Sequence, residues 1–98
     1  SDLFLATIAP MDPSRCDPRC RGVGYALVPG FNDQLRNIAN IEATPLVDVH
    51  AAFNGDLSLL STDGLHPNAA GYQKIADTFQ DVIVRVLETK GIAAPRID

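Results

Sequence analysis

Two side chains that could share a proton lie three residues apart in the segment STDGLHPNAAGY, Ser61–Tyr72. In acyl transfer a histidine takes a proton from a nucleophile and later passes it to the leaving group, and an imidazole can do both near neutral pH. A carboxylate behind the ring fixes its tautomer and stabilises the imidazolium. Asp63 and His66 can take these two roles from one tight loop.

The residues around this pair hold the loop that carries it. Gly64 permits a tight turn, and Pro67 restricts His66 to extended backbone angles. Asn68 is a natural N-cap, so a helix is expected to begin there and to fix the downstream end of the loop. The alternative is a surface histidine in a loop that leads into a helix, because the Asp-x-x-His spacing alone is not specific.

The beginning of the chain predicts a strand followed by a long loop. Residues Leu3–Ala9 are nearly all apolar, which is typical of a strand buried on both faces of a parallel sheet. Residues Pro10–Pro29 contain scattered prolines and glycines and predict a loop. A loop of this length is often functional.

The middle of the chain predicts a short helix and a second strand. The spacing of apolar residues predicts a helix over Asp33–Ile41, with Asn32 or Asp33 as its cap. Leu46, Val47 and Val49 are apolar and follow Pro45, which is tolerated at the start of a strand, so they predict a second buried strand.

The longest predicted element is a helix over about Ala69–Lys90. Asn68 suits its N-cap, and Gly91 suits the position after its last residue. Polar residues fall mainly on one side of this helix. The apolar residues that repeat at helical spacing on the other side are Tyr72, Ile75, Ala76, Phe79, Val82, Ile83, Val86 and Leu87.

The order strand, helix, strand, helix is that of an α/β fold. Two parallel strands do not make a stable sheet, because both faces and both edges must be covered. We therefore expect the chain to be the last portion of a larger doubly wound domain. The apolar strand edges predict a partner, either a missing N-terminal half or a second copy of the chain.

Composition excludes some classes of partner. The 98 residues suit one small domain or part of a larger one, and 46% hydrophobic with 20% charged residues is typical of globular proteins. The net charge of −4 argues against nucleic acid, because phosphate binding needs a basic face. The sequence contains no run of about 18 apolar residues, so no membrane-spanning helix is predicted.

A second candidate site lies in the first long loop. Arg15, Arg19 and Arg21 surround Cys16 and Cys20. Ligands bind at the carboxyl ends of strands in open α/β sheets, so these arginines are candidate substrate contacts for anionic or polar groups. The alternative is a solvated loop. The cysteines permit one disulfide or two redox-sensitive thiols, and with two histidines elsewhere they are too few for a typical zinc site.

The segment DGLHPNAAGY, with the amphipathic helix after it, resembles the last conserved block of the SGNH or GDSL-type serine hydrolases. Three other segments are similar to that family: LFLATIAPM to the strand before its long loop, FNDQLRNIA to a helix with a Tyr/Phe-Asn-x-x-Leu-Arg pattern, and PLVDVHAAF to its final strand. The resemblance covers nearly the whole chain. On this basis residues 1–98 are identified as the C-terminal portion of a single SGNH hydrolase domain.

The resemblance implies a flavodoxin-like three-layer α/β/α sandwich with a parallel sheet and a Ser-His-Asp triad. His66 would be the general base and Asp63 its orienting carboxylate, with no metal or organic cofactor. The family acts on esters, thioesters and acyl groups, which implies a small-molecule ester, acylated sugar or lipid as substrate. Secreted hydrolases of this kind are common, which favours a Cys16–Cys20 disulfide and a secreted or extracytoplasmic location.

The sequence departs from the family in having no nucleophile block. In the family the serine lies in a Gly-Asp-Ser block near the N-terminus, and two middle blocks supply the oxyanion glycine and asparagine. None of these blocks is present here, and no serine of this chain lies in such a context: Ser1, Ser14, Ser58 and Ser61. We expect the N-terminal half of the same protein to supply them, on the intact chain or after a nick. The alternative is an inactive fragment or a binding or assembly module.

Three further polar residues are expected to be structural. His50 follows the second strand and is expected to be a satisfied loop histidine rather than part of a pocket. Asp48 is expected to be a hydrogen-bonded structural carboxylate, because a buried carboxylate needs partners. Asn32 is expected to cap a helix rather than to bind an oxyanion.

Overall fold

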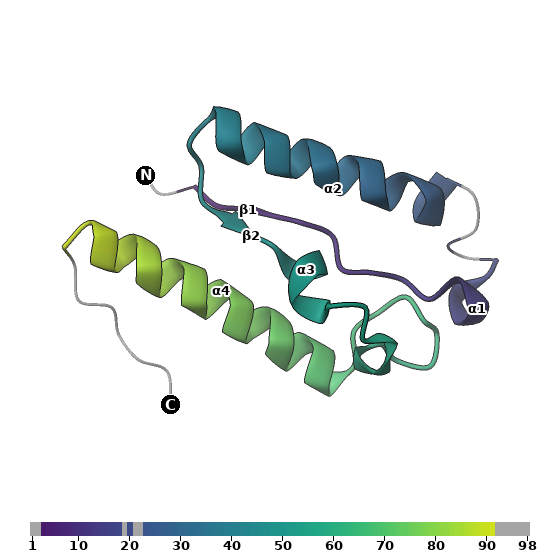
Figure 1. Ribbon diagram of the computed structural model, residues 1–98. Helices are drawn as coiled ribbons and strands as arrows, with labels where there is room; N and C mark the ends of the chain where they lie inside the picture. Colours follow the sequence, from purple (N-terminus) through teal and green to yellow (C-terminus); the bar gives the residue numbers. More distant parts are fainter. Residues whose placement is uncertain (1–2, 19, 21–22, 92–98) are drawn as a thin grey trace.

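The computed structural model describes residues 3–18, 20 and 23–91. It has an α/β fold in which a short pair of parallel strands lies between two long helices (Figure 1). This confirms the α/β class expected from the order of elements. The elements in chain order are β1 (Leu5–Ala6), α1 (Pro13–Cys16), α2 (Val23–Ile41), β2 (Leu46–Val47), α3 (Val49–Phe53), the 3-10 helix η1 (Leu57–Leu59) and α4 (Ala69–Thr89).

The two strands are shorter than the apolar runs that predicted them. β1 and β2 pair in parallel, with Leu5 opposite Leu46 and Ala6 opposite Val47. Leu5 and Ala6 are half-buried, so the expectation of burial on both faces is not met. The described residues form a sheet of two strands. Each strand therefore has a partner along one edge, and regular strand structure is limited to the residues that pair.

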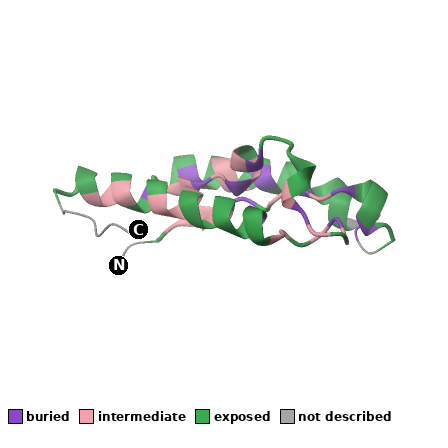
Figure 2. Ribbon diagram, turned by 90° about the horizontal axis from the view of Figure 1, so that it is seen from below, coloured by how far each residue is buried: buried purple, intermediate pink, exposed green. Residues whose placement is uncertain are grey.

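The core lies between the strand pair, α3 and α4. Figure 2 shows the buried residues gathered in the interior of the molecule and the outer surfaces of the helices exposed. Phe53 is 1% exposed, and the residues buried with it are Val47, Val49, Leu60 and Val82. Apolar side chains from β1 and α4 pack around this group, so the core joins elements from both ends of the described chain.

Helix α4 begins and ends as the sequence predicts. Asn68 is the N-cap, and its side chain accepts a hydrogen bond from the backbone N–H of Gly71 at 2.9 Å. The helix ends at Thr89, and Gly91 follows with φ +74°, the left-handed angle expected of a residue after a helix. Its predicted apolar face is only partly buried: Val82 is buried, whereas Tyr72 is 57% exposed.

The loop predicted over Pro10–Pro29 is wrong, because two helices occupy much of it. Helix α1 begins at Pro13, a residue well suited to the first turn, and Asp12 caps it by accepting from Ser14 N at 3.0 Å. Helix α2 begins at Val23, ten residues before the predicted start, and contains Pro29 in its interior.

Helix α2 starts earlier than predicted because its side chains pack against the rest of the protein. The proline and glycines in this segment had indicated a loop. Val28, Asn32 and Ala39 are buried at helical spacing along the face of α2 that meets β1. Pro29 lacks an N–H, so one hydrogen bond of the helix is lost, but the stripe of buried side chains continues through it.

Asn32 is a core residue, which corrects its expected role as a cap. Its side chain is 1% exposed and lies in the middle of α2. Its amide oxygen accepts from Ile8 N at 2.8 Å, and its amide nitrogen donates to Ile8 O at 3.0 Å. The side chain therefore satisfies the backbone of Ile8, two residues after the end of β1, as a neighbouring strand would.

Asp48 has the structural role that the sequence predicts. As N-cap of α3 it accepts a hydrogen bond from Ala51 N, and it also accepts from the buried Thr7 hydroxyl at 2.9 Å. Arg36 of α2 donates to both its carboxylate oxygens, at 2.9 and 3.2 Å. Donation from Arg36 is the main reason that the pKa of Asp48 falls from 3.8 to about 2.

This network predicts acid-dependent stability. Because the pKa of Asp48 is lower in the folded than in the unfolded chain, the ionised carboxylate stabilises the fold above about pH 4 and loses this effect as the pH falls towards 2. With solvent screening of the partly exposed pair, we expect Asp48→Asn to lower the free energy of unfolding at pH 7 by about 1–2 kcal/mol. Urea unfolding at pH 7, 4 and 2.5 would measure it.

Asp33→Asn is the matched control, because Asp33 pairs with the same Arg36 but its side chain is 75% exposed. We expect it to change little. If Asp48→Asn and the parent chain lost stability in parallel between pH 4 and 2.5, the role assigned to Asp48 would be wrong.

Candidate functional site

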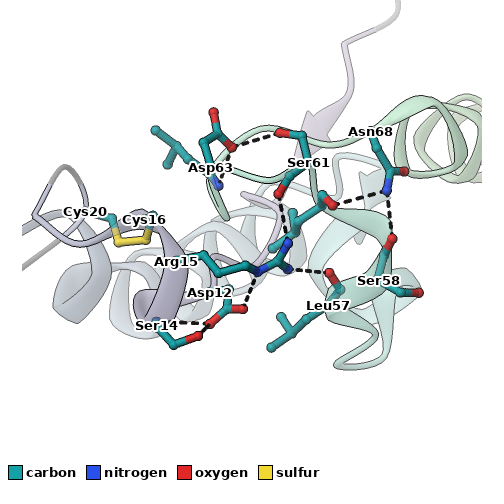
Figure 3. A network of polar contacts seen from close by, with 12 residues as sticks. Asp12, Ser14, Arg15, Cys16, Cys20, Leu57, Ser58, Ser61, Asp63 and Asn68 are labelled. Atoms are coloured by element: carbon teal, nitrogen blue, oxygen red, sulfur yellow. Dashed lines mark hydrogen bonds and ion pairs between the residues drawn. A yellow bond between two sulfur atoms is a disulfide. The ribbon is translucent and has the colours of Figure 1, made fainter.

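The Asp63–His66 pair lies in a closed loop between η1 and α4. Leu60 and Pro67 form an antiparallel bridge at the base of the loop, and Ser61 N donates to His66 O at 2.8 Å. Asn68 fastens the same base, because its amide nitrogen donates to the carbonyls of Ser58 at 2.7 Å and Leu60 at 3.1 Å (Figure 3). The loop is thus held at both ends.

The imidazole and the carboxylate are in direct contact. His66 Nδ1 lies 2.7 Å from Asp63 Oδ2, while Asp63 Oδ1 accepts from the backbone N–H groups of Leu65 at 2.9 Å and His66 at 3.0 Å. Ser61 Oγ lies 2.8 Å from the same oxygen and 2.9 Å from His66 O, and it can donate to either. These hydrogen bonds, that of the His66 ring first, hold the pKa of Asp63 well below its ordinary value.

A general base needs an accessible ring and a carboxylate partner that is less exposed, and the two side chains differ in this way. The Asp63 side chain is 22% exposed, whereas that of His66 is 64% exposed. A carboxylate on Nδ1 selects the tautomer in which Nε2 carries no proton. Within the described residues no hydrogen bond reaches Nε2, so this nitrogen can accept a proton from a group outside the described chain.

Gly64 fits this loop against α1. Its φ is +67°, and its carbonyl oxygen accepts from Asp12 N at 2.8 Å. A Cβ on Gly64 would lie 2.7 Å from the Cβ of Arg15 and 2.8 Å from the carbonyl oxygen of Asp12. The sequence predicted the turn at Gly64, but the close approach to α1 appears only in the structure.

Of the three arginines that the sequence suggested as substrate contacts, Arg15 alone lies within the described residues. Arg15 donates to Asp12 Oδ2 at 2.7 Å, to Ser61 O at 2.9 Å and to Leu57 O at 2.7 Å (Figure 3). Its guanidinium is engaged within the protein, and its role as a substrate contact stays a prediction. Arg19 and Arg21 lie outside the described residues.

The two cysteines are joined in a disulfide. Cys16 ends α1 and Cys20 follows four residues later, with their Cα atoms 5.6 Å apart. Both are buried, at 0% and 2% exposed. The bond closes the turn after α1 beside the loop of Asp63 (Figure 3).

Among the described residues, His50 shares no hydrogen bond with Asp63 or His66. It belongs to α3 rather than to a loop, and its backbone N–H donates to the Thr7 hydroxyl at 2.9 Å. Its side chain borders a pocket of about 390 Å³. His50 was expected to lie outside a pocket, and this expectation is wrong. The other residues that line the pocket are Pro10, Met11, Tyr25, Ala26, Val28 and Pro29.

Other classes of site have little support in the described residues. Within residues 3–18, 20 and 23–91, no group of three or more histidine, cysteine, aspartate or glutamate side chains is placed to hold a metal ion. Over the same ranges, no helix has the length and apolar character needed to cross a membrane.

The fold has a counterpart among solved structures. It is similar to the crystal structure of LAE5, an alpha/beta hydrolase enzyme from the metagenome of Lake Arreo, Spain, with 30% sequence identity and a TM-score of 0.63. The match covers 84% of this chain and 38% of that one, so the chain spans well under half of its neighbour's length. No protein-family model and no curated protein matches the sequence.

The contact of Gly64 with α1 predicts a packing cost that can be separated from backbone strain. We expect Gly55→Ala to cost about 1–2 kcal/mol, because its φ of +73° is strained for alanine although no atom lies within 4 Å of the new Cβ. Gly64 has a similar φ, and Gly64→Ala should lower the free energy of unfolding by about 1–3 kcal/mol more than Gly55→Ala does, because its Cβ would overlap with α1. Urea unfolding of both variants would measure the difference, and equal losses would contradict the proposed packing.

Proposed function

We propose that this chain supplies the base and the acid of a Ser-His-Asp triad in an ester hydrolase of the SGNH or GDSL type. His66 would take a proton from a serine hydroxyl through Nε2, and Asp63 would hold the ring and stabilise the imidazolium. The serine would attack the ester carbonyl, His66 would protonate the leaving alcohol, and water would then release the acyl group. The observation that carries the proposal is the 2.7 Å contact between His66 Nδ1 and Asp63 Oδ2, with Nε2 on an exposed ring.

The nucleophile is proposed to come from a segment outside these 98 residues. Ser14 Oγ donates to Asp12 at 2.6 Å, Ser58 Oγ donates to Asp56 at 2.5 Å, and Ser61 Oγ can donate to Asp63. Each of these described serines is therefore held by a nearby carboxylate, and none donates to the His66 ring. A Gly-Asp-Ser block on an N-terminal half would supply the missing hydroxyl.

Uncovered apolar surface supports such a second segment. Leu27, Phe31, Ile38 and Ile41 lie on one side of α2, at helical spacing, and are 60%, 53%, 46% and 68% exposed. This stripe is distinct from the buried stripe that faces β1. A wider parallel sheet with further helices would cover it, giving the flavodoxin-like three-layer sandwich of which the chain would form the C-terminal part. The length of the hydrolase neighbour supports this arrangement, since the match covers 38% of it.

The substrate class and the location are part of the proposal. A small-molecule ester, an acylated sugar or a lipid suits a triad that needs no cofactor. A secreted or extracytoplasmic location is supported by the Cys16–Cys20 disulfide, because disulfides persist in oxidising compartments.

An assembly module is the second candidate, and the same exposed stripe on α2 favours it. In that case the stripe would bind a partner that carries no nucleophile, and the Asp63–His66 pair would be structural. The two candidates differ in whether a reactive serine accompanies the chain.

The decisive experiment begins with intact mass spectrometry of the native protein under denaturing conditions. We expect a polypeptide, continuous or nicked, that contains a Gly-Asp-Ser block in addition to these 98 residues. A fluorophosphonate probe should label that serine, and the protein should hydrolyse p-nitrophenyl acetate. His66→Ala and Asp63→Asn should each lower kcat by about 10³–10⁴-fold, because the members of a triad act as a unit.

Asp56→Asn is the matched control for Asp63→Asn. Asp56 caps η1 and accepts from the N–H and hydroxyl of Ser58, but no histidine contacts it. We expect this variant to keep its activity. A protein without a second segment or a labelled serine, or a fully active Asp63→Asn variant, would exclude the triad.

A further inference from the structure

Arg15 connects helix α1 to the loop that carries the acid–base pair. Its guanidinium donates to two carbonyl oxygens far along the chain, those of Leu57 in η1 and Ser61 at the base of the loop. The third donor, Nε, contacts Asp12 Oδ2 at 2.7 Å and so fixes the planar group at its own end. Three of the five N–H groups of an arginine are thereby used within the protein.

Ser61 transmits this contact to Asp63. Its carbonyl oxygen accepts from Arg15 at 2.9 Å and from Gly64 N at 2.9 Å, while its hydroxyl can donate to Asp63 Oδ1 at 2.8 Å or to His66 O at 2.9 Å. The carboxylate that holds the His66 ring is thus itself held by a residue that Arg15 anchors. Contacts of this kind, behind the groups that react, set the geometry of a site.

The anchor of Arg15 is itself fixed in place. Asp12 also accepts from the Ser14 hydroxyl at 2.6 Å, and Asp12 N donates to Gly64 O at 2.8 Å. The Cys16–Cys20 disulfide closes the chain directly after α1, and Cys16 is fully buried. Helix α1 therefore contacts the loop at three points: through the Arg15 side chain, through the backbone of Asp12 and through packing on Gly64.

We propose that Arg15 is a positioning residue, which through Ser61 holds Asp63 in the orientation that keeps the proton of His66 on Nδ1. This rests on the proposed function only for its catalytic consequence, since the tautomer can be observed without a substrate. A lysine cannot replace the arginine fully, because its single ammonium group cannot span three acceptors in the plane of a guanidinium.

The test is NMR spectroscopy of the His50 and His66 rings in the native protein that contains these 98 residues. Long-range ¹H–¹⁵N spectra at about pH 8 report the ratio of Nδ1–H to Nε2–H tautomers. In Arg15→Met, which keeps the aliphatic length and removes the donors, we expect this ratio at His66 to fall by about fivefold or more. Hydrogen exchange at the amides of Leu65 and His66, which both donate to Asp63, should become about tenfold faster.

Arg85→Met is the matched control. Arg85 is an exposed residue of α4 whose Nε donates to Asp81 O within the same helix, so the same change is made away from the loop. We expect this variant to leave the His66 ratio unchanged. The ring of His50 serves as an internal reference in every spectrum and should not change in either variant.

The outcomes separate this proposal from the proposed function. A His66 tautomer ratio in Arg15→Met within twofold of that in Arg85→Met would overturn the positioning role, whether or not the protein hydrolyses esters. If Arg15→Met does not give dispersed amide spectra, the same comparison is made with Arg15→Lys, for which we expect at least about a twofold fall. An unchanged ratio in Arg15→Lys would then overturn the proposal.

Discussion

The contact of Gly64 with helix α1 is the constraint on which the candidate site depends. The backbone of Asp12 and Gly64 is joined by a 2.8 Å hydrogen bond, and no room remains for a Cβ at Gly64. Because of this close approach, Arg15 can reach carbonyl oxygens in the loop and in η1. The disulfide after α1 fixes the other side of the contact. The loop of Asp63 and His66 is therefore held by the first fifth of the chain as well as by its own turn.

Asp48 and Asp63 show how similar carboxylates acquire different roles. Each caps a local turn, accepts from a hydroxyl and from backbone N–H (one group for Asp48, two for Asp63), and has a lowered pKa. The remaining partner of Asp48 is Arg36, which stays charged and has no proton to exchange near neutral pH. The remaining partner of Asp63 is an imidazole whose second nitrogen is exposed. The partner, more than the carboxylate, distinguishes the candidate site from a structural ion pair.

Sequence patterns predicted the second half of the fold better than the first. The limits of α4 follow from Asn68 and Gly91, which act on their own neighbours, and the prediction was correct within one residue at the C-terminal end. The start of α2 was missed because Gly24, Pro29 and Gly30 are typical of loops, whereas the burial of Val28 favours the helix. A signal was present, since Val28, Asn32 and Ala39 already have helical spacing. The glycines and the proline, which usually interrupt helices, outweighed this signal.

The sequence by itself determined what depends on residues a few positions apart. The Asp63–His66 pair, its turn at Gly64 and the cap at Asn68 are local, because backbone geometry brings such neighbours together in any context. The tertiary structure decided the roles of Arg15 and Asn32, whose partners lie 46 and 24 positions away. No local pattern distinguishes an arginine that faces solvent from one that holds a distant carbonyl, because only the packing of α1 and α2 determines which acceptors come within reach.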